Sequence, residues 1–125
     1  MKLRLLDDSI RLRLSRDEVV AADERGVVEG RTRFPDGSVF TFALEAVEND
    51  SNASASYSSD RLVVKLPAPK ISAWAKDDTA VSLHGELALP LGGQLKLLVE
   101  KDFECISPRD DEDQSNLFRN PAKTC

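Results

Sequence analysis

The sequence predicts an α+β fold, a twisted and mostly antiparallel sheet of about six to seven strands with two helices on one face. Three observations predict it. Hydrophobic and polar residues alternate along most of the chain, which is the period of a half-buried strand. Two short segments carry helix signals instead. The order of strand, helix, strand and strand then occurs twice, in residues 10–45 and 62–100, which indicates an internal repeat.

The first half begins with a strand and a helix. Residues Ile10–Leu14 alternate between apolar and basic side chains. Ser15 and Glu18 then stand at the spacing of a capping box, in which each side chain bonds the backbone N–H of the other residue. Gly26 stands where a helix would end, because glycine adopts the left-handed conformation without strain. These signals predict a helix between Ser15 and Gly26.

A hairpin follows the helix. Its two strands are predicted at Val28–Phe34 and Phe40–Leu44, joined by the turn-forming residues 35–38. When the sequence is shifted by fifty-five positions, residues 28–45 fall on 83–100 without a gap, and two glycines, a proline and the apolar positions coincide. This coincidence is the main argument for a duplication.

The second half repeats the order of the first. We expect a strand at Leu62–Leu66, a short helix at Pro67–Lys76, and two strands around Leu83 and Leu97. Residues 48–60 are rich in Ser, Asn and Asp and form the seam between the halves, although their last part could extend the strand that follows.

Composition limits the classes of function. The 125 residues predict one domain, with 41% hydrophobic residues and a net charge of −5. Residues 104–125 are predicted to be an irregular acidic tail. An acidic chain with few aromatic residues lacks the basic stacking surface of a nucleic-acid binder, so we expect no nucleic-acid partner. Without a long apolar run or a signal-peptide pattern, we expect no membrane association and a bacterial cytoplasmic location.

Strand parity predicts an apolar face and a polar face on the sheet. The polar face is mixed in charge and includes two Arg-x-Arg pairs. Its candidate ligand-binding residues are Arg11, Arg13, Arg31, Arg33, Glu45, His84 and Glu100, and Lys101, Asp102 and Cys105 after the last of these are candidates as well. Guanidinium groups bind carboxylates and phosphates through paired hydrogen bonds. If the sheet curls around this face, the arginines would line an anion-binding concavity.

Two other interpretations of the polar face stay open. A solvated sheet face, with weak cross-strand ion pairs, is the commoner arrangement. Alternatively, an apolar stripe through Val39, Val63 and Leu98 would form the contact of a homodimer, with the charged residues as its rim.

Recognisable cofactor and metal motifs are missing from the sequence. Gly92-Gly93 lacks the spacing of a phosphate-binding loop. Two cysteines and one histidine match no zinc-ligand set. Glu100, Asp102 and Glu104 alternate and could hold Mg²⁺, but exposed carboxylates of this kind are more often solvated. We therefore expect no cofactor and no resident metal.

The sequence favours a non-enzymatic binding or interaction module. Its arginine-rich face would accept a small anionic ligand or an acidic protein segment. The alternative is an enzyme that acts on a phosphorylated or carboxylated small molecule. It would hold the substrate with the arginines and use Glu100, Asp102 or Cys105 as the reactive group.

Two stretches resemble a family of short bacterial proteins of unknown function. One is the opening Met1-Lys2-Leu3-Arg4 followed by Ser9-Ile10-Arg11-Leu12-Arg13-Leu14, and the other is Glu100-Lys101-Asp102-Phe103-Glu104-Cys105. The resemblance implies no activity. The positions that match the motifs of the family are Ser9, Arg11, Arg13, Glu100, Lys101, Asp102 and Cys105. The tail matches more loosely, because Arg119 precedes Asn120-Pro121 where a Phe-Pro-Asn-Pro-like ending is expected.

The predicted architecture also resembles two groups of ligand-binding proteins. A duplicated strand-helix-strand-strand unit is similar to the gyrase-inhibitor-type domains, which bind small molecules between their two halves. Alternating charged strands resemble those of the triphosphate-tunnel phosphohydrolases, but the Glu-x-Glu-x-Lys opening of that group is missing here. A shared topology does not determine a function, so neither likeness assigns an activity.

Overall fold

The computed structural model describes residues 1–48 and 52–103. In this part of the chain the elements are, in order, β1 (Lys2–Leu5), β2 (Ser9–Leu14), α1 (Arg16–Arg25), β3 (Val27–Arg33), β4 (Val39–Val47), β5 (Ser54–Ser58), β6 (Arg61–Pro67), α2 (Ala68–Lys76), β7 (Ser82–Ala88) and β8 (Gln94–Lys101). The described residues therefore form an α+β fold with two helices, as predicted.

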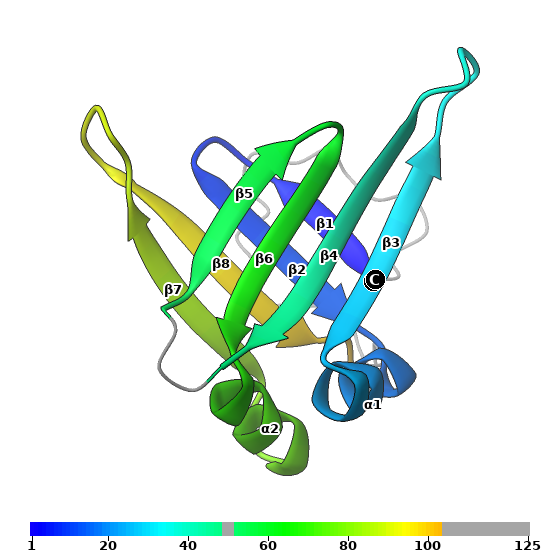
Figure 1. Ribbon diagram of the computed structural model, residues 1–125. Helices are drawn as coiled ribbons and strands as arrows, with labels where there is room; N and C mark the ends of the chain where they lie inside the picture. The colour runs from blue at the N-terminus through cyan, green and yellow to red at the C-terminus, as the bar shows by residue number, and fades with distance from the viewer. Residues whose placement is uncertain (49–51, 104–125) are drawn as a thin grey trace, which may run out of the picture.

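The strands form two sheets, not the single sheet of six to seven strands that the sequence predicts. Sheet A has the order β1-β2-β8-β7, and sheet B has the order β3-β4-β6-β5 (Figure 1). In each sheet the two central strands are parallel to each other, and each of them pairs with an antiparallel edge strand. The two halves of the chain thus exchange strands, since β2 pairs with β8 and β4 pairs with β6. Hydrophobic periodicity cannot reveal such long-range pairing.

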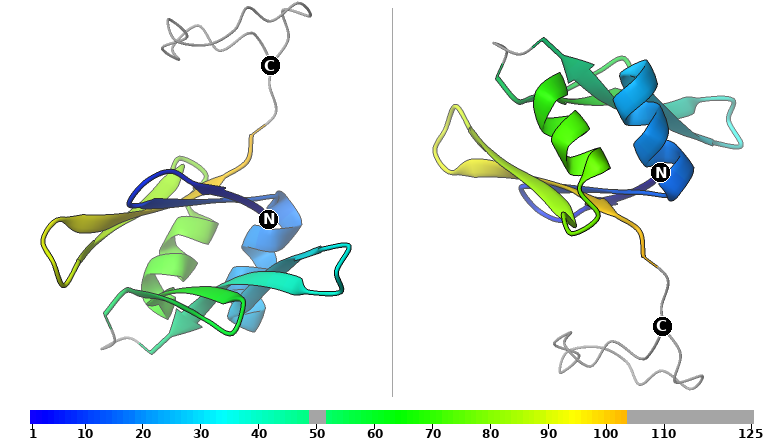
Figure 2. Two further views of the ribbon diagram at one scale, coloured as in Figure 1. Left: turned by 90° about the horizontal axis from the view of Figure 1, so that it is seen from above. Right: turned by 90° about the horizontal axis from the view of Figure 1, so that it is seen from below.

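One hydrophobic core joins both sheets and both helices. The helices lie between the sheets at one end of the molecule, and not on one face of a single sheet as predicted (Figures 1 and 2). Leu12 and Val99 of sheet A and Leu44 and Val64 of sheet B are each 1% exposed and belong to one cluster with Ile71 of α2. The apolar residues of both sheets are therefore buried against the same helices.

The two helices begin in different ways. Ser15 and Glu18 form the predicted capping box at the start of α1, and Gly26 ends that helix with a φ of 77°. The helix α2 starts after Pro67 without a side-chain cap. Its Trp74 is 2% exposed and donates a hydrogen bond from Nε1 to the carbonyl oxygen of Val81 at 3.1 Å. None of the described helices is long and apolar enough to span a membrane.

Two edge strands were not predicted. The first, β1, pairs with β2 at the start of the chain. The second, β5, lies within the segment 48–60 that was predicted as a seam, and pairs with β6. Ser59 and Asp60 connect β5 to β6, and both have positive φ values, 50° and 59°. This is the backbone twist of a tight two-residue hairpin turn. The segment is thus partly a strand in its own right, and does not extend β6.

The same local features recur in the two halves. In the turn between β3 and β4, the N–H of Phe34 donates to the carbonyl of Ser38 at 2.9 Å. Fifty-five residues later, between β7 and β8, the N–H of Leu89 donates to the carbonyl of Gly93 at 3.1 Å. The orders of the two sheets also match when each strand of one half is replaced by its counterpart in the other. The duplication of residues 10–45 and 62–100 stays a prediction, which these correspondences support.

Candidate functional site

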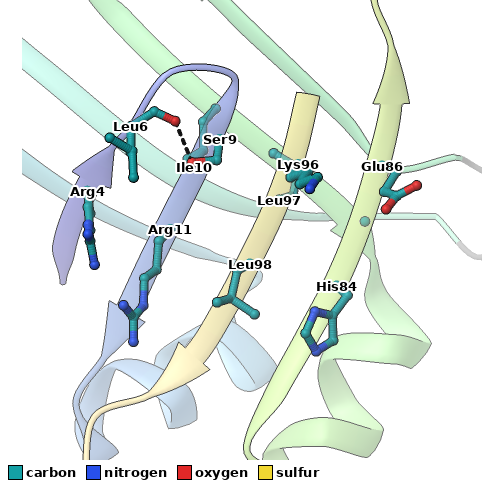
Figure 3. A pocket seen from close by; sticks show the side chains of 11 residues that line it. Arg4, Leu6, Ser9, Ile10, Arg11, His84, Glu86, Lys96, Leu97 and Leu98 are labelled. Atoms are coloured by element: carbon teal, nitrogen blue, oxygen red, sulfur yellow. Dashed lines mark hydrogen bonds between the residues drawn. The ribbon is translucent and has the colours of Figure 1, made fainter. Parts of the chain in front are cut away.

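The outer face of sheet A carries a row of side chains that crosses all four strands. Arg4 of β1 is the register partner of Arg11 of β2, Arg11 is the partner of Leu98 of β8, and Leu98 is the partner of His84 of β7. These side chains alternate with the buried apolar residues of the same strands, so they face away from the core. Figure 3 shows the four side chains side by side on this face.

A carboxylate fixes two arginines beside this row. Arg11 donates from Nε to Oε1 of Glu100 at 2.6 Å, and Arg13 donates from Nε to the same oxygen at 2.5 Å. The Nη2 of Arg11 lies 2.5 Å from that oxygen as well. The side chain of Glu100 is only 12% exposed. The three residues together carry a net charge of +1, and the positions of both guanidinium groups are set by one acceptor.

The pKa of Glu100 reflects these contacts. Burial raises the pKa of this carboxyl group, because the charged form loses hydration. Hydrogen bonds from Arg13 and Arg11, together with their positive charges, outweigh that effect and hold the pKa below its ordinary value. Glu100 is therefore ionised at neutral pH.

A pocket of about 350 Å³ lies over the row on the outer face of sheet A. Its lining residues include three cations, Arg4, Arg11 and Lys96, and one carboxylate, Glu86. Leu98 is half-buried and provides an apolar floor between the charged groups. Within residues 1–48 and 52–103, Arg4 and Lys96 are exposed and make no ion pair.

The rim of this pocket is shaped by the turn between β1 and β2. The hydroxyl group of Ser9 donates to the carbonyl oxygen of Leu6 at 2.6 Å, as the dashed line in Figure 3 marks. The N–H of Lys96 donates to the carbonyl oxygen of Asp8 at 2.9 Å, which ties the start of β8 to the same turn. These bonds fix the turn beside the start of β8, and residues of both segments line the pocket.

The structure does not place all four predicted arginines on one face. Arg31 and Arg33 lie on β3, an edge strand of sheet B, whereas Arg11 and Arg13 lie on sheet A. The predicted face is divided because the polar sides of the two sheets point in different directions. Arg31 and Arg33 therefore do not line the pocket of sheet A.

Glu45 belongs to a separate group of charges on sheet B. The Nη2 atom of Arg61 lies 2.6 Å from Oε1 of Glu29 and 3.6 Å from Oε2 of Glu45. The sequence had not singled out Arg61, which the parallel pairing of β4 and β6 brings to these carboxylates.

The residues that follow Glu100 divide between different parts of the structure. Lys101 donates from Nζ to the carbonyl oxygen of Asp77 at 2.9 Å and lies 5.6 Å from the ring centre of Trp74, so it is directed toward α2. Asp102 pairs with Lys2 of β1 at 2.8 Å. Cys105 and the predicted acidic tail 104–125 lie outside the described residues.

The apolar stripe predicted as a homodimer contact is not continuous. Leu98 lies on sheet A, whereas Val39 and Val63 lie on sheet B. Val63 is 9% exposed and Val39 is 38% exposed, so these two offer little shared apolar surface. The single-sheet prediction had placed all three on one face.

A second cavity, of about 670 Å³, lies where β2 and β8 end beside the helices. Leu14, Val19 and Phe103 contribute apolar lining, and Arg16, Asp78, Lys101 and Asp102 contribute charged groups. Lys101 and Asp102 are engaged by Asp77 and by Lys2. The two cations and two carboxylates of this lining balance in charge, whereas the pocket of sheet A has three cations and one carboxylate.

Sequence reasoning missed the cations that β1 supplies. Lys2 and Arg4 alternate with Leu3 and Leu5, which is the strand signal used elsewhere in the chain. That four-residue segment could have been predicted as a strand. Its pairing with β2 would then have placed Arg4 beside Arg11. Lys96 alternates with Leu95 and Leu97 in the same way but was not singled out as a binding residue.

Comparison with known proteins places the chain in a family. A model described as "Family of unknown function (DUF7009)" matches residues 1–122. The chain belongs to this family. The predicted membership of a family of unknown function is thereby confirmed, and the DUF7009 match includes both sheets and both helices. Searches of curated proteins and of solved structures found no match.

No set of metal ligands is present in the part of the DUF7009 chain that the structure describes. In residues 1–48 and 52–103, no group of three or more His, Cys, Asp or Glu side chains lies close enough together to hold a metal ion. Glu100 and Asp102, which the sequence placed in a candidate Mg²⁺ site, are instead paired with cationic side chains. Glu104 lies outside the described residues.

Proposed function

We propose that this protein is a non-enzymatic binding module that accepts a small anion at the outer face of sheet A. The ligand class is a molecule with phosphate or carboxylate groups. The observation that carries the proposal is the cross-strand pair Arg4 and Arg11 at the mouth of a pocket that Lys96 also lines. The remaining expectations, a cytoplasmic location and a bacterial source, belong to this proposal as well.

The chemistry of the pocket supports an anion over a cation or an apolar ligand. Guanidinium groups present planar pairs of N–H donors that match carboxylate and phosphate oxygens. Glu100 orients Arg11, whose position is then maintained without a ligand. Arg4 and Lys96 make no ion pair with a described residue, including Glu86, the register partner of Lys96, and can turn toward a bound anion. Leu98 would contact an apolar part of the ligand.

The contacts of Glu100 favour binding over catalysis. A general acid must carry a proton near neutral pH. Glu100 accepts hydrogen bonds from two guanidinium groups that hold its pKa down, so it carries none. Asp102 is paired with Lys2. Of the reactive groups that the enzyme alternative names, Glu100 and Asp102 are thus engaged by cations, and Cys105 lies outside the described residues.

The test compares two double variants with the same change in charge. Arg4→Gln with Lys96→Gln removes the two unpaired cations of the pocket. Arg31→Gln with Arg33→Gln removes two exposed cations of sheet B that also make no ion pair with a described residue. Melting temperatures are measured with inorganic phosphate, pyrophosphate and citrate, at constant ionic strength set with chloride, because surface electrostatics depend on salt.

We expect at least one of these anions to stabilise the wild type and the Arg31→Gln/Arg33→Gln variant. Ligand at about ten times its Kd adds about 1.4 kcal/mol to the free energy of unfolding, which corresponds to several degrees in Tm. The Arg4→Gln/Lys96→Gln variant should lose that increase in melting temperature. Equal increases in the melting temperature of both variants would reject the proposed site. No increase in the melting temperature of the wild type with any of the three anions would reject it as well.

A further inference from the structure

The acidic residues at the end of β8 lie along the basic outer face of sheet A. Glu100 is bound by Arg11 and Arg13, and two residues later Asp102 is bound by Lys2. Glu100 and Asp102 therefore both pair with cations of β1 or β2 on this face. Arg4 and Lys96 make no ion pair with a described residue, and the one carboxylate that lines the pocket beside them is Glu86, the register partner of Lys96.

The sequence beyond Phe103 contains further acidic residues. The run Asp110-Asp111-Glu112-Asp113 begins seven residues after Phe103. It lies outside the described residues. Four consecutive carboxylates are complementary in charge to the three cations that line the pocket of sheet A.

The distance between the end of β8 and the pocket suits this run. Lys96 lies seven residues before Phe103, which is about 23 Å along a strand. A chain of seven to ten residues extends at most about 25–35 Å, so residues 110–113 can return from Phe103 to the level of Lys96. Asp102 already lies on the outer face through its bond to Lys2, so the return does not need to pass through the core.

We propose that the acidic run Asp110–Asp113 binds in the pocket lined by Arg4, Arg11 and Lys96 and competes there with external anions. This inference rests on the proposed function of the pocket and identifies the acidic segment as part of the same chain. A tethered competitor acts at a high local concentration. An external anion then binds only while the pocket is free, so its measured Kd equals its intrinsic Kd divided by the fraction of time that the pocket is free.

The test uses full-length variants. In the first, Asp110→Asn, Asp111→Asn, Glu112→Gln and Asp113→Asn together remove four negative charges from the run. The matched control removes four charges elsewhere, through Asp17→Asn, Asp23→Asn, Glu24→Gln and Glu48→Gln. None of these four control residues lines the pocket or takes part in a described ion pair. The Kd for pyrophosphate is measured by calorimetry at constant ionic strength.

If the run fills the pocket about nine-tenths of the time, the run variant should bind pyrophosphate about tenfold more tightly than the wild type. The control should bind like the wild type. Equal tightening in both variants would mean a general effect of net charge and would overturn the inference. Wild-type affinity in the run variant would also overturn it, but the proposed anion site would stand.

A second measurement does not depend on any external anion. Backbone amide chemical shifts of Arg4, Lys96 and Leu98 are compared between the wild type and the run variant without ligand. We expect these shifts to change in the run variant and to stay constant in the control. Unchanged shifts at all three residues would reject the docking of the run, even if no tested anion binds. If no tested anion binds but these amide shifts change in the run variant, only the proposed function is rejected.

Discussion

The ring of Phe42 on β4 lies over Gly30 on β3, so closely that a Cβ atom at position 30 would come within 2.4 Å of the ring atom Cζ. The two residues are register partners in the antiparallel pair. At the corresponding place in the second half, Gly85 lies under Leu97, where an added Cβ would meet Cδ1 at 3.6 Å, an ordinary van der Waals contact. The two glycines therefore have different tolerances for a side chain.

We expect Gly30→Ala to destabilise the protein by about 1–3 kcal/mol, because the Phe42 ring must move within a packed core. Gly85→Ala should be neutral or slightly stabilising, since it fits and reduces the freedom of the unfolded chain. Urea unfolding followed by circular dichroism measures both free energies. Equal effects of the two substitutions would contradict the close contact between Phe42 and position 30.

A second prediction concerns the pH dependence that Glu100 contributes. Its pKa is lower in the folded protein than the ordinary value of 4.5. A carboxyl group whose pKa is lowered by folding stabilises the folded state above its unfolded pKa, and this stabilisation is lost as the pH falls through the folded pKa. The wild type should therefore be more stable than Glu100→Gln at pH 7, and the difference should shrink below about pH 4.5.

The control for this prediction is Glu86→Gln, which removes one negative charge from the same face. Glu86 makes no ion pair with a described residue. Free energies of unfolding are measured from pH 3 to pH 7 for all three proteins. A difference between the wild type and Glu100→Gln that is constant over this range would show that the carboxylate charge does not stabilise the fold through Arg11 and Arg13.

Strand parity predicted the buried side of the strands that the sequence analysis expected but could not show which strands pair. Leu12 and Leu44 both lie on the core side of their strands, although they belong to different sheets. Alternation depends only on neighbours along the chain. The parallel pairing of β2 with β8 joins residues about eighty-seven positions apart, such as Arg13 and Glu100, and no local signal encodes it.

For the candidate site, too, the sequence could indicate the residues but not the sheet on which each of them lies. Arg11, Arg13, His84 and Glu100 were named from the sequence, and all four lie on sheet A. Arg31 and Arg33 share the same residue pattern but lie on the other sheet. Their placement depended on the pairing of strands, which the single-sheet prediction had wrong.

A third prediction tests the cap of α1. The side chain of Ser15 accepts a hydrogen bond from the N–H of Glu18 at 3.4 Å, and Oε1 of Glu18 accepts one from the N–H of Ser15 at 2.9 Å. Ser15→Ala removes the first bond, so we expect a loss of about 0.5–2 kcal/mol in the free energy of unfolding. Ser15→Asp should restore most of it, because aspartate is also a good N-cap. An alanine variant as stable as the wild type would contradict the role of this cap.

The exchange of strands between the two halves predicts that the protein unfolds as one cooperative unit. Sheet A contains β1 and β2 of the first half with β7 and β8 of the second, and sheet B contains β3 and β4 of the first half with β5 and β6 of the second. Neither half can therefore unfold without disrupting both sheets. Trp74 is the one tryptophan of the chain, and it lies in the cluster that includes residues of both sheets.

The fluorescence of Trp74 should report the same urea transition as far-UV circular dichroism, which follows all the strands and helices. Coincident midpoints and slopes from the two probes are the test of two-state unfolding. Two independent repeats, each with its own sheet, would instead give a Trp74 transition limited to the second half, separate from part of the dichroism change. Because β2 pairs with β8 and β4 with β6, we expect a single transition, and separate midpoints would contradict the exchanged pairing of the sheets.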